Sequence, residues 1–229
     1  MREIVFDTET TGIDPLSGDR VVEIGCIELI DGVETGVSWH RYINPERSMP
    51  AEAFAVHGLS DSFLADKPKF AELVDEFLEF VGSDTRLIAH NAAFDFGFID
   101  AELTRCRRDP LCRTRMVDTM AIARARHPGA KHSLDALCVR YGIDRSHRLK
   151  HGALLDAELL AQVYIELNGG RQIGLALGAL DALAGEREIR ITPRERPFRT
   201  PRVHTASEAE LAAHAAFIAR IAQPIWLAA

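Results

Sequence analysis

The sequence predicts an α/β fold, in which one domain holds a mixed sheet flanked by helices and a separate tail follows it. Apolar runs typical of strands alternate with segments of helical spacing, which is the pattern of a sheet covered by helices. The chain has 229 residues, of which 47% are hydrophobic, so it can bury one substantial core. Its composition changes after Gly170. We therefore expect a domain at residues 1–170, a flexible linker at 171–206 and a terminal helix within 207–229.

Five segments have the short apolar composition of strands: residues 4–6, 21–30, 33–43, 85–90 and 116–118. Asp31-Gly32 separates the second segment from the third, and this dipeptide favours the positive φ angles of a tight hairpin turn. The second and third strands should therefore run antiparallel.

Helices are predicted where apolar residues recur at i, i+3, i+4 and i+7 next to capping residues. The expected helices are residues 51–57 before Gly58, Pro68 to about Gly82, Asn91 to beyond Leu103, a helix that ends at His127, a helix capped by Ser133, and Gly152 to Leu167. Asn91 should cap the helix that carries Asp95. In the tail, Ser207 and Glu210 form a capping box that begins a short amphipathic helix.

The charges are unevenly distributed around a net charge of −7. Residues 1–104 hold 7 Lys and Arg against 21 Asp and Glu, whereas residues 105–150 hold 12 against 4. A basic segment beside an acidic half suits a phosphate-binding surface around a carboxylate site, although a solvated basic face would give the same pattern.

The sequence shows no sign of a membrane or an oxidising environment. No apolar run approaches the ~18 residues that span a bilayer, and Met1-Arg2-Glu3 begins a strand rather than a leader peptide. The four cysteines form no C-x-x-C pair and stand at no zinc-finger spacing, so we expect reduced thiols. A cytoplasmic protein is expected.

Two acids follow the first strand directly. Asp7 and Glu9 share one face because strand side chains point the same way at i and i+2. Like charges held this close to a core repel each other and lose hydration, so a divalent cation between them is the natural explanation. The alternative is a solvated strand end with two unrelated acids.

Two further acids occur at structural junctions later in the chain. Asp95 lies near a helix start and Asp156 lies early in a late helix, so the four carboxylates could hold two metal ions. His151 stands five residues before Asp156, which corresponds to ~140° around a helix. His151 is therefore expected on the loop before Gly152, from which it could act as a base at neutral pH.

At these residues the sequence resembles a known family. Three motifs resemble those of the DEDDh 3′→5′ exonucleases: Asp7-Thr8-Glu9-Thr10-Thr11-Gly12, His90-Asn91-Ala92-Ala93-Phe94-Asp95 and His151-Gly152-Ala153-Leu154-Leu155-Asp156. The match runs from residue 4 to about residue 170 and is strongest to exonucleases that proofread for bacterial replicative DNA polymerases. A sister subfamily has tyrosine four residues before the last aspartate, where this chain has Gly152.

The resemblance implies a ribonuclease H-like fold that hydrolyses mispaired 3′-terminal nucleotides of DNA. It implies that Asp7, Glu9, Asp95 and Asp156 bind two Mg²⁺ or Mn²⁺ ions and that His151 is the general base. Substrate contacts are expected from Thr10, Glu52, His57 and Phe94. Phe94 or Phe96 could stack on a terminal base, and the other could belong to the core. His57 could instead be a structural hydrogen-bonding residue, and His90 and Asn91 could support the site or cap the helix.

The tail resembles partner-binding segments of the same proofreading proteins. Gln172-Ile173-Gly174-Leu175-Ala176-Leu177 resembles a sliding-clamp motif, with Leu177 where stronger versions have phenylalanine. Residues 186–204 hold six arginines and three prolines, which suits an extended linker. The helix after it, with Trp226, resembles a segment that docks on the catalytic (alpha) subunit of the polymerase. If the clamp-like motif does not bind a partner, its apolar residues simply extend the last helix of the domain.

Two other functions remain open from the sequence. The first is an RNA-trimming exonuclease of the same fold, because nothing in the three motifs recognises a 2′-hydroxyl. The second is a non-catalytic subunit that bridges clamp and polymerase. The four clustered acids and His151 argue against a scaffold, which has no need of them, and the tail argues for a replication protein.

Overall fold

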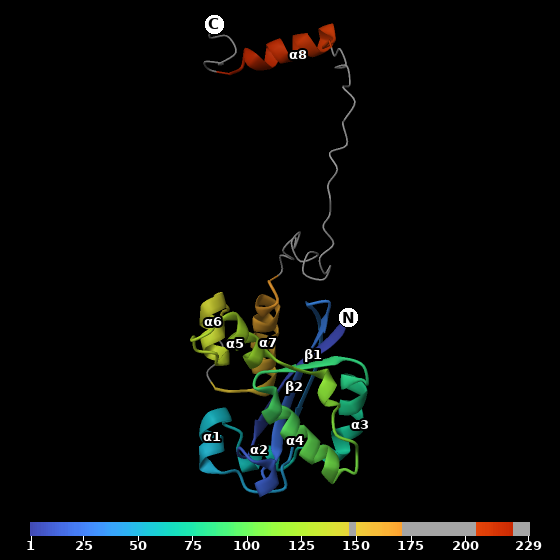
Figure 1. The fold of residues 1–229 in the computed structure, drawn as a ribbon, viewed down its shortest axis with the longest axis vertical. Coiled ribbons are helices and arrows are strands. Elements are labelled where there is room, and N and C mark those ends of the chain that lie inside the picture. Colours follow the sequence, from blue (N-terminus) through green and yellow to red (C-terminus); the bar gives the residue numbers. More distant parts are fainter. Residues whose placement is uncertain (147–149, 171–204, 222–229) are drawn as a thin grey trace, which may run out of the picture. The chain divides into compact units, whose positions relative to one another are not determined.

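The computed structural model describes residues 1–146, 150–170 and 205–221. The chain divides into two units, Met1–Leu175 and Ala176–Ala229. The first contains a sheet with helices on both faces, and the second contributes helix α8 (Glu208–Ile218) (Figure 1). The clamp-like motif at 172–177, Trp226 and nearly all of the expected linker lie outside the described residues.

The sheet has five strands in the order β3-β2-β1-β4-β5. The strands are β1 (Arg2–Thr10), β2 (Val21–Ile30), β3 (Val33–Tyr42), β4 (Arg86–Ala89) and β5 (Met116–Asp118). β2 pairs antiparallel with β1 and β3, whereas β4 pairs parallel with β1 and β5. The predicted mixed sheet is confirmed, and β1 lies at its centre.

The hairpin between β2 and β3 follows the sequence prediction. Asp31 and Gly32 have φ angles of 51° and 75°, so both turn residues adopt the left-handed conformation. This twist matches the twist of the flanking strands. The turn therefore fixes the antiparallel pairing of β2 with β3.

The helices also lie close to their predicted positions. They are α1 (Ala51–His57), α2 (Asp61–Leu64), α3 (Phe70–Val81), α4 (Ala92–Arg105), α5 (Thr119–Arg126), α6 (Leu134–Tyr141) and α7 (Ala153–Leu167), with 3₁₀ turns η1 (Pro15–Ser17) and η2 (Arg113–Arg115). Helix α3 begins at Phe70 rather than Pro68, because Lys69 still has extended backbone. The short helix α2 was not predicted, since its four residues are too few for apolar periodicity; the Ser60 cap is its signal in the sequence.

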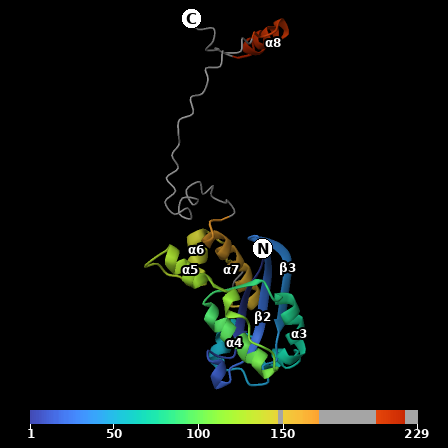
Figure 2. The same cartoon turned by 45° about the vertical axis from the view of Figure 1, so that its right-hand side comes forward.

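The helices cover the sheet in two layers. Figures 1 and 2 show α3 and α4 on one face of the sheet and α7 on the other, with α5 and α6 beside α7. Ile4 and Phe6 of β1 belong to the core on the α3 and α4 side, whereas Val5 belongs to the core that contains Ala157 of α7. Alternate residues of β1 therefore face different helices.

The predicted side-chain cap at Asn91 is wrong. Asn91 stands at the start of α4, but its side chain makes no capping hydrogen bond and its φ angle is 63°. Its backbone N–H instead donates to Asp118 Oδ1 at the end of the neighbouring strand β5, over 3.0 Å. Asparagine tolerates this left-handed conformation better than most residues do.

The helices carry no membrane-spanning segment within the described part of the chain. No described helix is both long enough and apolar enough to cross a bilayer.

Candidate active site

The first two acids lie where strand geometry predicted. Asp7 and Glu9 alternate with Phe6 and Thr8 along β1, so they share the face of Val5, toward α7. Glu9 is 8% exposed and Asp7 is partly buried. The register of β1 on β2 shifts between Glu9 and Thr10, because Val22 of β2 is an extra residue opposite this end of β1. Bulges commonly redirect side chains beside functional sites.

Helix α7 brings the third acid to the same face. Its first turn approaches β2 so closely that a Cβ atom on Gly25 would overlap the backbone of Leu154. Gly25 is the cross-strand partner of Asp7. The absence of a side chain at Gly25 therefore lets Asp156, in the first turn of α7 and 3% exposed, reach the end of β1. Gly25 was missed in the sequence, although a glycine inside a strand often marks such an approach.

His151 lies on the loop before α7, as predicted. The helix begins after Gly152, and the side chain of His151 is 47% exposed. Its Nδ1 lies 3.2 Å from Asp156 Oδ2. Glu9, His151 and Asp156 each offer one atom to a group in which all three atoms lie within 4.8 Å of one another. The structure therefore brings together residues from two of the three sequence motifs.

Asp95 approaches from the opposite layer. It lies in the first turn of α4, and its Oδ1 accepts a hydrogen bond of 2.8 Å from the hydroxyl of Thr8. Asp95 is 3% exposed, and this burial raises the pKa of its carboxyl group to about 7, although the Thr8 hydrogen bond opposes the shift. Thr8 had no role in the sequence analysis. It joins Asp95 to the strand that carries Asp7 and Glu9.

The donor set fits a hard divalent cation. Three of the four predicted ligands, Glu9, Asp95 and Asp156, are buried carboxylates. Glu9 and Asp156 lie close together, and burying such like charges is costly without a compensating positive charge. Carboxylate oxygens are the ligands that Mg²⁺ prefers, and Mn²⁺ accepts the same set. His151 is close enough to Glu9 and Asp156 to bind the same cation.

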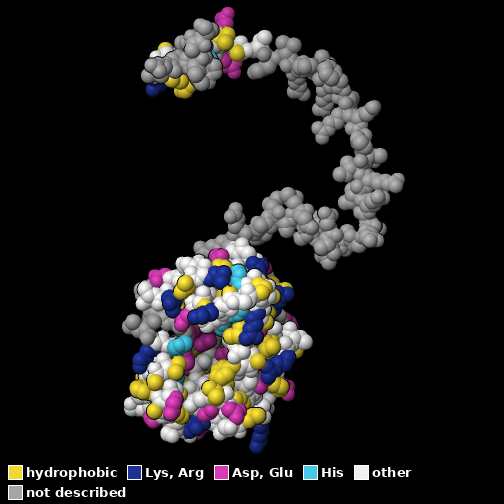
Figure 3. Space-filling model, turned by 60° about the vertical axis from the view of Figure 1, so that its left-hand side comes forward, with side chains coloured by type: hydrophobic (Ala, Val, Ile, Leu, Met, Phe, Trp, Pro, Cys, Tyr) yellow, Lys and Arg dark blue, Asp and Glu magenta, His cyan; other side chains and the backbone are white. Residues whose placement is uncertain are grey.

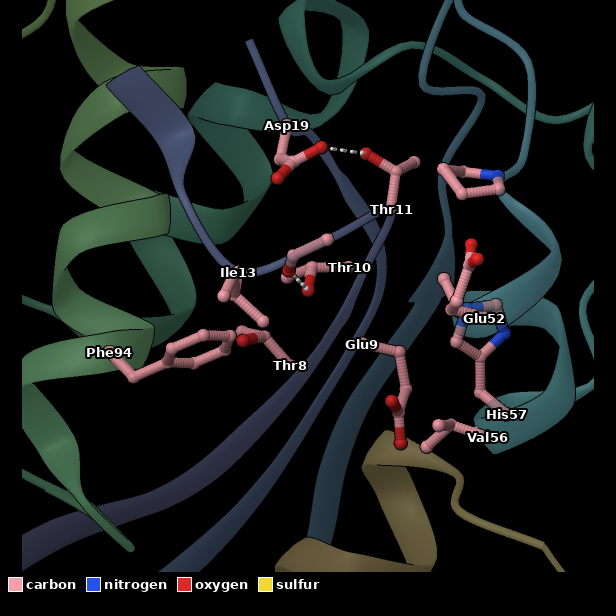
Figure 4. Close-up of a pocket in the computed structure, with 13 residues that line it drawn as sticks. Thr8, Glu9, Thr10, Thr11, Ile13, Asp19, Glu52, Val56, His57 and Phe94 are labelled. Atoms are coloured by element: carbon pink, nitrogen blue, oxygen red, sulfur yellow. Dashed lines mark hydrogen bonds between the residues drawn. The ribbon is translucent and has the colours of Figure 1, made fainter. Parts of the chain in front are cut away.

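A pocket of about 570 Å³ opens beside Glu9. Its lining includes all four predicted substrate residues: Thr10, Glu52, His57 and Phe94. Figure 4 shows Phe94 and Ile13 on one side of the pocket, with Glu52, Val56 and His57 of α1 on the other. Residues from β1, α1 and α4, far apart in the sequence, therefore converge on one cavity next to the acids.

His57 is the most enclosed of these substrate residues. It is 6% exposed, and its Nδ1 accepts a hydrogen bond of 3.0 Å from the backbone N–H of Leu59. Burial lowers the pKa of His57, although the nearby charge of Glu23 and the carbonyl of Thr10 act in the opposite direction. The neutral ring therefore carries its proton on Nε2, which is buried near the carbonyl of Thr10.

The two candidate stacking residues are distinguished by burial. Phe96 is fully buried, and its ring centroid lies 5.7 Å from that of Phe6 in the core. Phe94 is partly buried, packs on Phe98 and lines the pocket. Phe94 is therefore the aromatic residue available to a ligand.

A short loop forms a further part of the pocket wall. Thr10 Oγ1 donates to the carbonyl of Gly12 over 2.6 Å, and Thr11 Oγ1 donates to Asp19 Oδ1 over 3.3 Å. Asp19 also accepts from the backbone N–H of Asp14 and pairs with Arg47. Asp19 was missed in the sequence, where it had the appearance of an ordinary loop acid.

The surface around the site is hollowed and carries both signs of charge. Figure 3 shows Asp, Glu and His side chains gathered in a hollow, with Lys and Arg side chains around it. A second pocket of about 550 Å³ includes Arg145, Lys150 and His151 in its lining. Part of the basic segment recognised in the sequence therefore borders the catalytic candidates.

The fold and this acidic site are those of a nuclease, and the exonuclease family matches residues 4–164. DNA polymerase III subunit epsilon of Rickettsia felis is 53% identical over 175 residues, covering 75% of this chain and 76% of the relative. The subunit of the same name from Escherichia coli is 44% identical over 224 residues, covering 94% of this chain and 91% of the relative. The chain therefore belongs to the family of DNA polymerase III epsilon subunits.

A solved structure supports the exonuclease fold. Exonuclease X in complex with 5′-overhanging duplex DNA is 27% identical and superposes with a TM-score of 0.57, covering 72% of this chain and 89% of the other. The predicted family, the ribonuclease H-like fold and the 3′→5′ exonuclease class are thereby confirmed. Dependence on a divalent metal is general to this family.

Proposed function

We propose that this chain removes mispaired nucleotides from the 3′ end of DNA during replication, as a subunit of DNA polymerase III. The observation that carries the proposal is the position of Glu9, which belongs both to the acidic cluster and to the lining of the pocket. A nucleotide in that pocket would therefore have its phosphate beside the carboxylates. The names and the extent of the matching relatives support the same role.

Four carboxylates would hold the metal: Asp7, Glu9, Asp95 and Asp156. When bound, two Mg²⁺ or Mn²⁺ ions would supply positive charge to the phosphate oxygens and lower the pKa of a water molecule. The protein holds these ligands on both sides of β1. Thr8 fixes Asp95 through its hydroxyl, and the close approach at Gly25 fixes the start of α7.

His151 would act as the general base. An imidazole nitrogen accepts a proton from the attacking water while the water oxygen forms a bond to phosphorus. The bond between phosphorus and the 3′ oxygen of the preceding nucleotide breaks, which releases a nucleoside 5′-monophosphate and leaves a new 3′-hydroxyl. The exposed loop position of His151 lets it reach solvent water, and its hydrogen bond to Asp156 orients the ring.

The pocket would bind the terminal nucleotide. Phe94 offers an aromatic face for the base. His57 would form part of the wall against the nucleotide, held in place by the hydrogen bond that its Nδ1 accepts from Leu59. Glu52 and Thr10 add polar groups at the rim. An unpaired end would enter more readily than a paired one, because pairing must first be broken.

The tail would hold the enzyme at the replication fork. We propose that Gln172, Leu175 and Leu177 contact the sliding clamp and that residues 207–229, including Trp226, bind the alpha subunit. Exposed Leu211 and Phe217 of α8 support a docking role for this segment, because apolar side chains on a short helix favour burial against a partner. The protein would accordingly work in the cytoplasm.

The proposal is tested with purified protein and 5′-labelled primers. A mispaired DNA primer should be shortened faster than a matched one in Mg²⁺ or Mn²⁺, and excess chelator should stop the reaction. Asp7→Ala serves as the inactive control, since it removes one ligand without disturbing the core. Undiminished activity in chelator, or cleavage confined to RNA primers, would contradict the proposal.

A further inference from the structure

Lys150 crosses from the loop before α7 to helix α1. Its ammonium nitrogen lies 5.3 Å from the ring centroid of Phe54 in α1. The same side chain packs against Gly58, where an added Cβ would lie 2.7 Å from Lys150 Nζ and 2.8 Å from Lys150 Cδ. Gly58 has a φ angle of 76° and ends α1, a position that favours glycine. The missing side chain also leaves room for Lys150.

This contact joins the two sides of the active site. Lys150 directly precedes His151, and α1 carries Glu52 and His57 on the pocket wall. The positive charge of Lys150 acts to lower the pKa of His57, which agrees with its position close to α1. An anchored Lys150 side chain therefore limits the positions that the backbone of His151 can take.

The anchor is useful because the ring of His151 lies at the surface. Its side chain is 47% exposed. Catalysis by a base on an exposed loop slows whenever the base leaves the reactive geometry. A cation over an aromatic ring is worth roughly 0.5–1 kcal/mol at an exposed site and more when it is desolvated.

We propose that Lys150 is a positioning residue, which holds the loop of His151 against α1 through Phe54 and Gly58. The inference rests on the proposed role of His151 as general base. It assigns Lys150 no contact with substrate. The Lys150 contact is a cation over an aromatic ring. Arginine at position 150 should therefore preserve the contact, whereas alanine should abolish it.

The main test compares steady-state kinetics of Lys150→Ala, Lys150→Arg and Phe54→Leu on a mispaired DNA primer. Lys150→Ala and Phe54→Leu should each lower kcat by about 2- to 5-fold with little change in KM, given the strength of such a contact at an exposed site. Lys150→Arg should retain most of the rate. The double variant Lys150→Ala/Phe54→Leu should have a kcat no lower than that of the slower single variant, because both changes remove the same interaction.

Lys67 provides a matched control. Its ammonium nitrogen lies 4.6 Å from the ring centroid of Phe63, in a similar lysine–phenylalanine contact near α2. Phe63 is 41% exposed and Phe54 is 43% exposed. Lys67→Ala should leave kcat and KM unchanged, and thermal melting of all variants should confirm that they fold.

Two results would overturn the inference. If Lys150→Ala raised KM and reduced the salt dependence of KM, Lys150 would bind a substrate phosphate instead. If kcat and KM were both unchanged, Lys150 would have no role in catalysis. The His151→Ala variant separates this inference from the proposed function. Full activity of His151→Ala would refute the role of His151 as base. If adding Lys150→Ala to His151→Ala lowered kcat further, Lys150 would not act by positioning His151.

Discussion

At the residue scale, Glu9 links the two parts of the site. It shares a face of β1 with Asp7, lies within 4.8 Å of His151 and Asp156, and lines the pocket that contains His57. Asp95 joins the same strand from the other layer, through Thr8. The chemistry and the substrate position therefore depend on a few side chains around one strand end.

The first prediction concerns the role of His151. His151→Ala should lower turnover by about 10²- to 10⁴-fold, which is the usual contribution of a positioned base. Metal affinity should change little, because the four carboxylates remain. Calorimetric titration with Mn²⁺ beside single-turnover kinetics checks both parts. An equally steep loss of metal affinity would instead make His151 a ligand, which its closeness to Glu9 and Asp156 allows.

The second prediction concerns pH and Asp95. Burial raises the pKa of Asp95 from 3.8 to about 7 in the metal-free protein. Between these values the folded state holds a proton that the unfolded state has lost, so stability falls as pH rises through this window. The Asp95→Asn side chain cannot ionise, so the folding stability of this variant should decline less than that of the unmodified protein as pH rises. Urea unfolding in chelator at pH 4–8 measures the difference.

Metal should offset this loss. Because ligands bind the cation only when deprotonated, Mn²⁺ should stabilise the unmodified protein more at pH 8 than at pH 5. Identical pH slopes for the unmodified protein and Asp95→Asn would show that Asp95 does not titrate in this range.

At the scale of elements, the start of α7 determines where Asp156 lies. The contact at Gly25 brings a helix backbone against a strand backbone, and neither can move aside as a flexible side chain could. The register shift between Glu9 and Thr10 also interrupts the regular pairing of β1 with β2 near the end of β1. The relative position of these two elements therefore sets the spacing of the acids.

The third prediction tests this contact. Gly25→Ala should destabilise the protein by about 1–3 kcal/mol, because the new methyl group overpacks a backbone contact. It should also lower turnover, since α7 must shift away from β1. Gly97→Ala in α4 is the control. Apart from its own helix, no atom of the described residues lies within 4 Å of the added Cβ. Alanine also favours a helix, so stability should stay equal or rise. Equal stability of both variants would refute the close approach.

At the scale of the whole molecule, catalysis and partner binding are expected to reside in different parts of the chain. Every described residue of the acidic cluster and of its pocket lies before residue 170. The segments proposed to bind clamp and polymerase follow that residue. Linked weak sites gain affinity through effective concentration, so a modest clamp contact can matter once the tail is held.

The fourth prediction separates these parts. Truncation after Gly170 should retain nuclease activity on free primers and abolish co-purification with the alpha subunit. Gln172→Ala combined with Leu175→Ala should weaken only the clamp contact, and Trp226→Ala should raise the dissociation rate from the polymerase. Full-strength polymerase binding by the truncated chain would place the docking site on the catalytic domain instead.

Most elements could be predicted because their signals are local. The β2–β3 turn follows from Asp31-Gly32, and α6 follows from the Ser133 cap, whose oxygen accepts from Ala136. Asn91 was mispredicted for the opposite reason. Its backbone partner is Asp118, 27 residues away on another strand, and no local rule reports such a bond.

The sequence by itself determined the acids, the loop position of His151 and the family, because these depend on residue type, on spacing within a few residues and on three motifs in order. Only the tertiary structure decided how they meet. It placed Asp95 and Asp156 on opposite sides of β1, gathered Glu52, His57 and Phe94 around Glu9, and laid Lys150 across α1. The physical reason is that strand order and the close packing at Gly25 fix distances between segments that local periodicity leaves free.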